Sequence, residues 1–316
     1  SQLGEDLLGQ DQNEQFANVA LNADGGDVLA ISGIGAYDLR GVVRVYKYSA
    51  PSNWTQLGSD VIGPPFSSIL SAKFGGRLAI SKDGMVLAAA APFANDFLGT
   101  VYIYRYSSED EDWIPYGNTS DGVVGVLTVP GARMFGIGLS LSRDGTKMAI
   151  NSNTFARVYS LANGTWEKVG QEIRDRNVNM VYTRQDGRAL AVRSETMSTT
   201  RVYFLNENDE EWVQVGNDIV MESSGSGFID LSADAKTIAI SNADYGNGLS
   251  DVADNAGNVI VLRFDALTGN WTRLGPAVGA AKLLKGTFAR EYFGTCISLS
   301  PDGNRILVGS HGFRNN

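Results

Sequence analysis

Short runs in which aromatic or β-branched residues alternate with polar ones recur along the chain and predict β-strands rather than helices. The clearest five are GVVRVYKY (41–48), GTVYIYRY (99–106), ARVYSL (156–161), TRVYFL (200–205) and GNVIVLRF (257–264). Upstream of each lies a second pattern, in which two alternating segments flank a turn Asp that is followed by Gly in all copies but one, as in ISKDGMVLAAA (80–90). Because Asp-Gly suits the positive-φ positions of a tight turn, this pattern predicts an antiparallel hairpin.

The hairpin pattern repeats, and its turn aspartates are Asp24, Asp83, Asp144, Asp186, Asp234 and Asp302. In the fifth copy Asp234 is followed by Ala235 instead of Gly, so we expect that turn to be built differently. The copies are unequally spaced, which indicates loops of different length between constant strands.

Tryptophan occupies one place in the repeat. All five Trp residues open a W-x-x-x-G motif, at Trp54, Trp113, Trp166, Trp212 and Trp271. Each unit therefore has two hairpin strands (A and B), the aromatic strand (C) and the Trp strand (D). Four antiparallel strands per unit are typical of a propeller blade. The sequence predicts an all-β fold, a β-propeller of four-stranded antiparallel blades, with at least six blades (six or seven).

Both ends of the sequence fall inside a unit. QLGEDLLG near the N-terminus matches the residues that follow Trp elsewhere, and the C-terminus comes just after strand B of the sixth copy. We expect residues 1–316 to form a single β-propeller domain whose last blade is incomplete. Either this sequence is a segment of a longer polypeptide, or another segment completes the last blade. We favour the first interpretation, because both ends fall inside a unit.

Three copies carry Phe-Gly nine residues before the turn Asp, at Phe74-Gly75, Phe135-Gly136 and Phe293-Gly294. With LAAAAPFANDFLGTVYIY after the first of them, the unit resembles the FG-GAP repeat of integrin α-subunit-like β-propellers. The resemblance implies a secreted or cell-surface recognition module. The D-x-D-x-D-G calcium loop found in such blades is missing, so the turn aspartates are interpreted as structural.

Loop lengths differ between the two ends of the predicted blades. The A–B and C–D connections are short, whereas the B–C and D–A connections vary in length. Because binding residues commonly lie on loops held by a rigid scaffold, we expect the B–C/D–A face to carry recognition. Its candidate residues are Tyr37, Phe93, Asp96, Phe97 and Tyr245. The alternative, that these loops are tolerated insertions, stays open.

One loop offers several oxygen ligands in a Gly-rich segment: Asp244, Asn247, Asp251 and Asp254. Calcium is the only cofactor that the sequence suggests, with Asp244, Asp251 and Asp254 as its carboxylate ligands. The spacing fits no known calcium-loop pattern, so a solvated acidic loop is the default interpretation.

Four Asn-x-Ser/Thr triplets, at Asn53, Asn118, Asn163 and Asn270, predict N-linked glycans. Three of them fall in C–D loops, which places them together at one end of the blades. Glycosylation favours an extracellular, cell-surface or secreted location. The lone Cys296 is compatible with that location, and we expect it to be a small buried residue on a strand A.

Charge and composition exclude several functions. The chain has 26 basic and 35 acidic residues, so nucleic acid is an unlikely partner, and no apolar stretch approaches the length that inserts into a bilayer. His311 is the only histidine, which argues against Ser-His-Asp, Cys-His and zinc sites. The sequence thus predicts a non-enzymatic extracellular interaction module for recognition, adhesion or matrix and filament assembly. Its partner would be a protein or glycan ligand, or neighbouring subunits.

Two alternatives remain open. One is a carbohydrate-processing propeller enzyme with carboxylate catalysis, since propellers host such enzymes. The other is a purely architectural subunit of a surface filament or coat.

Overall fold

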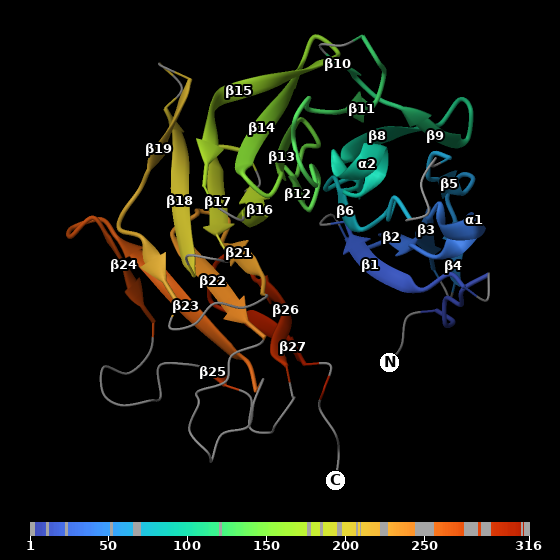
Figure 1. Cartoon of the computed structure of the whole chain (residues 1–316). Helices are drawn as coiled ribbons and strands as arrows, with labels where there is room; N and C mark the ends of the chain where they lie inside the picture. The colour runs from blue at the N-terminus through green and yellow to red at the C-terminus, as the bar shows by residue number, and fades with distance from the viewer. Residues whose placement is uncertain are drawn as a thin grey trace. The chain divides into compact units, whose positions relative to one another are not determined.

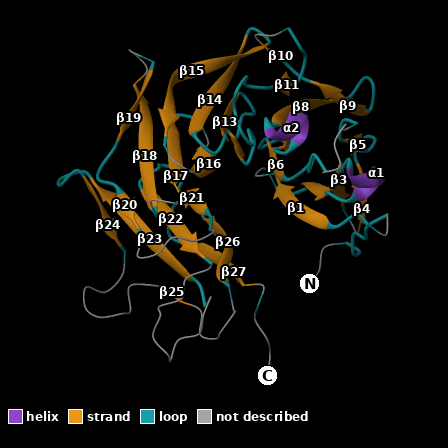
Figure 2. Cartoon of the chain, in the orientation of Figure 1, coloured by secondary structure: helices purple, strands orange, loops and turns teal. Residues whose placement is uncertain are grey.

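In the described residues, the computed structural model of the chain contains β-strands and two short helical segments (Figures 1 and 2). It describes residues 4–10, 13–22, 25–50, 53–65, 71–119, 122–175, 178–183, 186–194, 198–206, 208, 210–221, 227–243, 256–274, 284–285, 292–310 and 312. These fall into two compact units: residues 1–174 with 185–187, and residues 175–184 with 188–316.

The first unit holds three sheets. The first consists of β1 (Phe16–Leu21), β2 (Val28–Gly33), β3 (Val42–Ser49), β4 (Asn53–Gln56) and β5 (Val61–Ile62). The second consists of β6 (Arg77–Ile80), β7 (Val86–Ala91), β8 (Thr100–Ser107), β9 (Asp112–Pro115) and β11 (Val126–Leu127). The third consists of β12 (Gly138–Leu141), β13 (Lys147–Asn151), β14 (Phe155–Ala162), β15 (Thr165–Arg174) and β10 (Asn118–Thr119).

The second unit holds two sheets of the same design and one hairpin. One sheet consists of β16 (Val178–Thr183), β17 (Ala189–Ser194), β18 (Thr199–Asn206), β19 (Glu211–Gln214) and β20 (Ile219–Val220). The other consists of β21 (Ile229–Leu231), β22 (Thr237–Asn242), β23 (Asn258–Asp265), β24 (Asn270–Arg273) and β25 (Leu284–Lys285). The hairpin pairs β26 (Phe293–Leu299) with β27 (Ile306–Ser310).

Four strands in each complete sheet follow one another in chain order with antiparallel pairing, as the sequence predicts for strands A to D. Strand D is longer than the sequence suggests, because after a short break a second piece pairs with strand C again. In the first sheet β4 and β5 both pair with β3, and in the second β9 and β11 both pair with β8. The expected D–A loop after Tyr116 therefore contains part of strand D. Residues 4–10, which the sequence predicts to continue a strand D, contain no strand.

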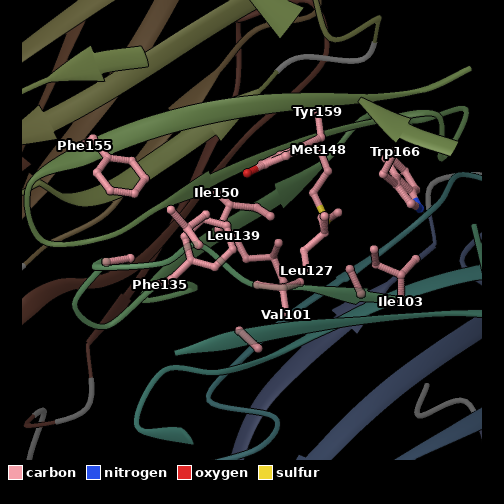
Figure 3. Packing of buried hydrophobic residues seen from close by; sticks show 14 of the residues in the cluster. Val101, Ile103, Leu127, Phe135, Leu139, Met148, Ile150, Phe155, Tyr159 and Trp166 are labelled. Carbon is pink, nitrogen blue, oxygen red and sulfur yellow. The ribbon is translucent and has the colours of Figure 1, made fainter. Parts of the chain in front are cut away.

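Strand B is the most buried strand of each complete sheet. In β7 all six residues of VLAAAA are buried, and in β17 and β22 all six are buried as well. A strand covered on both faces has no polar alternation, which explains the unbroken apolar run. Figure 3 shows part of this packing: Val101 and Ile103 of β8 face Leu139, Met148 and Ile150 of the next sheet.

The A–B turns are held by a serine and an aspartate. In the second sheet the Ser81 hydroxyl donates to Asp83 Oδ1 (2.5 Å), and that oxygen also accepts the backbone N–H of Met85 (3.0 Å). Equivalent bonds form at Asp144, Asp234 and Asp302. These aspartates are therefore turn residues, as predicted, whereas Asp24 lies outside the described residues.

The expectation that the fifth turn is built differently is wrong. Asp234 Oδ1 accepts from the Ser232 hydroxyl (2.6 Å) and from the N–H of Lys236 (3.0 Å), as its equivalents do. Ala235 takes the position of the turn glycine with φ of 52°. The side-chain bonds thus hold the turn even though alanine is strained in the left-handed region.

The W-x-x-x-G motif links consecutive sheets. The Trp166 indole N–H donates to the carbonyl oxygen of Tyr116 (3.2 Å), the residue before Gly117, and Trp271 donates in the same way to Val215 (2.9 Å), before Gly216. A Cβ on Gly117 would lie 2.4 Å from the Trp166 indole nitrogen. Glycine is required because the indole of the following sheet lies against it.

The Phe-Gly pairs have a packing role too. Phe74 and Phe135 are fully buried, and the glycines that follow them have φ of 81° and 93°. A Cβ on Gly75 would lie 2.6 Å from the Cβ of Ser32, in strand B of the preceding sheet. Cys296, expected to be buried, is instead exposed on β26.

Candidate functional site

Three candidate residues of the predicted binding face lie on short left-handed turns. The segments α1 (Ala36–Leu39) and α2 (Ala94–Phe97) each contain residues at positive φ, among them Tyr37 (52°) and Asp96 (54°). Non-glycine residues pay a conformational cost in this region. The turns follow β2 and β7 and present Tyr37, Asp96 and Phe97 to solvent.

Tyr37 takes part in a buried charge cluster. Its hydroxyl donates to Asp60 Oδ2 (2.7 Å), and the Arg44 guanidinium bonds both Asp60 (2.9 Å) and Glu14. Burial acts to raise the pKa of Asp60, but hydrogen bonds from Arg44, Tyr37 and Gln56 outweigh it and hold that pKa below its ordinary value. The side chain of Arg44 is only 4% exposed, so this cluster offers little access to a ligand.

The Arg44–Asp60 pair recurs in two other sheets. Arg157 pairs with Glu172 (2.5 Å) and Arg201 with Asp218 (2.8 Å), in each case between strand C and the second part of strand D. In the remaining two complete sheets the strand C position is Tyr102 or Ile260, and no acid stands two residues after the motif glycine. Arginine and acid are present together or missing together, which indicates a structural pair.

A cavity of about 270 Å³ opens among the strands A and the loops of the predicted recognition face in the first unit. Its size is near the lower end of the range for small-molecule sites. It is lined by Ala17, Asn18, Ile34, Lys73, Gly76, Arg77, Pro92, Phe93 and Ile137. Phe93 is thus the one predicted binding residue that the structure places in this cavity. Phe97 packs on Phe93, with ring centroids 5.5 Å apart.

Two cations stand in the wall of this cavity, which we call the inner pocket. Arg77 opens β6 and is partly buried, and Lys73 lies just before the buried Phe74 with its ammonium 4.8 Å from the Phe93 ring centroid. Arg77 Nη1 donates to the Gly76 carbonyl (3.1 Å). Burial lowers the pKa of Arg77 from its ordinary value. Among the described residues neither cation has a carboxylate within ion-pair distance.

Hydrogen bonds hold the backbone of the segment that carries Arg77 and the exposed Lys73. Lys73 has φ of 52°, and its carbonyl accepts the N–H of Gly76 (2.9 Å), which closes a turn. Asn18 of β1 donates through its side-chain amide to the carbonyl oxygens of Gly75 (3.2 Å) and Gly76 (3.0 Å). The segment that carries Lys73 and Arg77 is therefore tied to the neighbouring strand A.

Sequence reasoning missed Asn18, Lys73 and Arg77. A usable signal exists, since the position four residues before the turn serine holds Arg77, Gly138, Phe228 or Cys296. Arg77 is the only charged residue of these four, at a position where strand A residues of other copies are small or apolar. A charge at such a position indicates a site more strongly than a charge in a loop.

A second cavity of about 360 Å³ lies in the third sheet beside β10 and β11. Its lining includes Arg157, Tyr159 and Trp166. Arg157 is already paired with Glu172, and Trp166 is bonded to Tyr116. Its polar groups are thus largely satisfied by the fold, and the inner pocket is the better candidate site.

The remaining candidate residues have mixed outcomes. Asn53, Asn118, Asn163 and Asn270 are all exposed, and Asn53 and Asn270 are the first residues of β4 and β24. Tyr245 and the proposed calcium ligands Asp244, Asp251 and Asp254 lie outside the described residues. Within the described part of the chain no group of three or more His, Cys, Asp or Glu side chains gathers as a metal site would require. No helix in that part is long and apolar enough to span a membrane.

Comparison with solved structures agrees with the fold. No family model and no curated protein matches the chain. Hydrazine synthase of Kuenenia stuttgartiensis is similar over 96% of this chain and 78% of its own, with 16% identity and a TM-score of 0.59. A candidate 6-phosphogluconolactonase from Bacteroides uniformis is similar over 92% and 76%, with 12% identity and a TM-score of 0.58. The periplasmic gluconolactonase of Pseudomonas aeruginosa is similar over 84% of this chain and 72% of its own, with 17% identity and a TM-score of 0.54.

These neighbours are seven-bladed β-propellers, and the chain has the propeller fold with four-stranded antiparallel blades. They also correct three expectations. The resemblance to FG-GAP repeats is wrong, because the neighbours are lactonase-type propellers and the Phe-Gly pairs are explained by packing. The expectations of a non-enzymatic adhesion module and of no enzymatic activity are contradicted by neighbours that are named as enzymes.

Proposed function

We propose that the chain is a hydrolase of small sugar lactones and that the inner pocket is its active site. The observation that carries this proposal is the pair Arg77 and Lys73, two cations in one small cavity without a described carboxylate partner. The neighbours named as gluconolactonase and candidate 6-phosphogluconolactonase support the substrate class. Hydrazine synthase has the same fold, so the fold alone does not select the reaction.

The chemistry of lactone opening matches what the pocket offers. A water oxygen adds to the carbonyl carbon, and the carbonyl electron pair moves to its oxygen, which becomes an oxyanion. The ring C–O bond then breaks, and the leaving alkoxide takes the proton that the water gives up, so that a hydroxy acid results. A guanidinium such as Arg77 stabilises the oxyanion by charge and hydrogen bonding.

The described lining contains no carboxylate or imidazole that would act as a general base. The sequence-based idea of carboxylate catalysis therefore finds no support in this lining. Asp96 stands three residues after Phe93 on the exposed turn α2 and is the acid to test first. Electrostatic stabilisation by the two cations is the main contribution that we propose.

A hydrolysis assay tests the proposal directly. The 316-residue chain is incubated with glucono-δ-lactone and with its 6-phosphate, and acid release is followed in a pH-stat above the spontaneous rate. We expect hydrolysis of at least one of them, and a loss of roughly 100-fold in kcat/KM for Arg77→Met, the effect typical of removing one oxyanion donor. Lys47→Met, an exposed lysine on β3, is the matched control and should keep full activity. Failure to hydrolyse any sugar lactone would refute this function.

We also propose that the protein is exported from the cytosol. The support is the exposure of Asn53, Asn118, Asn163 and Asn270, each in an Asn-x-Ser/Thr triplet. In the first and third sheets the C–D turns that hold Asn53 and Asn163 lie at the opposite end of strand C from the B–C loops. Glycans there would leave the inner pocket open.

A further inference from the structure

The turn between β14 and β15 presents an asparagine and a glycine to solvent. Ala162 and Thr165 pair as the last residues of the two strands, so Asn163 and Gly164 alone make the turn. Their φ angles are 49° and 78°, both positive as a type I′ turn requires. Asn163 is exposed, and a methyl group added to Gly164 would meet no atom within 4 Å. Water therefore reaches both residues.

We infer that Asn163 is a site of spontaneous deamidation, which converts it to aspartate and isoaspartate. The Gly164 backbone nitrogen attacks the side-chain carbonyl carbon of Asn163 and forms a C–N bond. The side-chain nitrogen leaves as ammonia and takes the proton that the Gly164 nitrogen gives up. Water then adds to either carbonyl of the resulting succinimide ring and breaks one of its C–N bonds, which leaves aspartate or isoaspartate. Water is the only co-reactant.

The two reacting groups are not engaged elsewhere. Among the described residues no hydrogen bond involves the Asn163 side chain or the Gly164 N–H. The Gly164 carbonyl accepts the N–H of Asn118 (2.7 Å), but this carbonyl belongs to the following peptide group. Glycine also carries no side chain that would shield its own nitrogen. The attacking nitrogen is therefore accessible in the folded chain.

The left-handed backbone of Asn163 favours ring closure. Type I′ and type II′ turns differ by a flip of the central peptide group, and both keep a positive φ at the first central residue, here Asn163. The flip takes ψ of that residue to about −120°, which brings the Gly164 nitrogen toward the side-chain carbonyl carbon. Gly164 then takes a negative φ, which glycine adopts freely. The ring can thus close while β14 and β15 stay paired.

Other exposed asparagines of the sequons lack these features. Asn53 Oδ1 accepts the N–H of Trp54 (3.1 Å), which is the group that would have to attack. The Asn270 side chain donates to the Thr268 carbonyl (3.1 Å), and a tryptophan follows Asn270 in the chain as well. Among the described residues Asn163 is the only asparagine that glycine follows. We therefore expect the reaction to single out this turn.

Deamidation of Asn163 and its glycosylation exclude each other on one chain. The reaction removes the asparagine that the Asn-x-Ser/Thr triplet requires. A glycan, in turn, is attached to the side-chain nitrogen that must leave as ammonia. The inference itself does not depend on export or on lactone hydrolysis, because it concerns the chain without a glycan.

Ageing of the purified chain tests the site. The 316-residue chain is made in a bacterial host without N-glycosylation and is held folded at neutral and at mildly alkaline pH. Peptide mapping by mass spectrometry and labelling by an isoaspartate-specific methyltransferase follow the products. We expect Asn163 to convert to aspartate and isoaspartate before the other described asparagines do. The rate should rise with pH, because the attacking nitrogen must lose its proton. Asn-Gly at 247–248 lies outside the described residues and is mapped separately.

Variants separate this reaction from general ageing. Gly164→Ala should slow the conversion of Asn163 several-fold, because the added methyl group shields the attacking nitrogen. Asn163→Gln should abolish the isoaspartate signal of this turn. Asn118→Gln, in the neighbouring sequon, is the matched control and should leave the rate at Asn163 unchanged. Circular dichroism of each variant shows whether it is folded.

Three outcomes would overturn the inference. Asn163 could stay intact while other described asparagines convert, or it could convert at the same rate in Gly164→Ala. The third is a rate in the folded chain far below that of a synthetic peptide of residues 158–169, which would show that the turn protects Asn163. None of these outcomes bears on the lactone assay, so the proposed function and this modification fail separately.

Discussion

The indole nitrogen of Trp113 lies 2.7 Å from the carbonyl oxygen of Leu57, in the preceding sheet, and donates its hydrogen to it. The next residue, Gly58, has φ of 76°, and a Cβ there would lie 2.8 Å from the Trp113 ring. The Trp and Gly of the repeat motif thus contact each other between consecutive copies and not within one.

Replacing Gly58 by alanine tests this contact. We expect Gly58→Ala to lower the free energy of unfolding by about 2–4 kcal/mol, since it adds overpacking against Trp113 to the cost of a positive φ. Gly164→Ala is the matched control, because Gly164 has φ of 78° and a methyl group added there would meet no atom within 4 Å. Gly164→Ala should lower the free energy of unfolding by only about 1 kcal/mol. Urea denaturation of both variants measures the difference, and equal losses would contradict the contact.

Replacing Trp113 by phenylalanine tests the hydrogen bond itself. The variant keeps an aromatic ring but leaves the Leu57 carbonyl without its indole donor. We expect a loss of about 1–3 kcal/mol in the free energy of unfolding, the usual cost of an unsatisfied buried acceptor. Tyr106→Phe, which changes the ring that packs on Trp113 at 5.6 Å without removing that bond, serves as the control and should cost less.

Ala235→Gly should stabilise the protein. Ala235 has φ of 52° in a turn whose other bonds are intact, so glycine relieves strain there. The gain should be about 0.5–1 kcal/mol, reduced by the loss of one buried methyl group. Ala239→Gly in β22 is the control and should destabilise, because Ala239 is buried in a regular strand. Thermal and urea unfolding measure both, and a destabilising Ala235→Gly would show that the turn is unstrained.

Stability should fall in acid as the Asp60 carboxylate, which pairs with Arg44, becomes protonated. Burial alone would raise the pKa of Asp60, but the bonds from Arg44, Tyr37 and Gln56 lower it below the unfolded value of about 3.9. The unfolded chain therefore binds the proton first as the pH falls. The contribution of Asp60 is complete above about pH 4 to 5 and is lost as the pH falls through its lower folded value.

Asp60→Asn should therefore lower stability at neutral pH and flatten the decline that begins below about pH 5. Asp38→Asn, which changes an exposed carboxylate on the turn α1, is the control and should change the free energy of unfolding at neutral pH by no more than about 0.5 kcal/mol. Urea denaturation at a series of pH values checks both. An Asp60→Asn profile parallel to that of the unmodified protein would show that this pair does not link folding to pH.

Secretion from a eukaryotic host tests the four sequons. We expect intact-mass and glycopeptide spectra to show N-linked glycans on Asn163, which stands exposed on the turn between β14 and β15, and on at least one of Asn53, Asn118 and Asn270. Asn163→Gln should remove one glycan mass. Spectra without any hexose or hexosamine adduct would withdraw the support for export.

Much of the fold could be predicted because its determinants are local. Alternating runs and Asp-Gly turns give the strands and hairpins, and the order A to D follows from short connections. The second half of strand D could not be foreseen, since Val126 and Leu127 of β11 carry too short an apolar pattern to stand out. The Ala235 turn differs from the expectation because its serine and aspartate bonds count for more than the missing glycine.

The site could be predicted only in part. Loop length led to Phe93, which lines the inner pocket, whereas a recognition role for the B–C/D–A face stays a prediction. Lys73 could not be predicted, because it is one cation among 26 Lys and Arg residues, and Arg77 stands out in the sequence only when the strands A are aligned on their turn serines. Tyr37 is exposed on the turn α1, but its hydroxyl is engaged by Asp60.

The Trp–Gly contact recurs between consecutive copies. Trp113 contacts Gly58, Trp166 contacts Gly117 and Trp271 contacts Gly216, so in these three pairs one copy provides the glycine and the next copy provides the indole. Removing residues 59–117 would place the Leu57 carbonyl and Gly58 next to Trp166. The same hydrogen bond and the same Trp–Gly contact would then form. An exchange of copies that is cut at this glycine would therefore keep one conserved contact, the Trp–Gly contact, between the copies that it brings together.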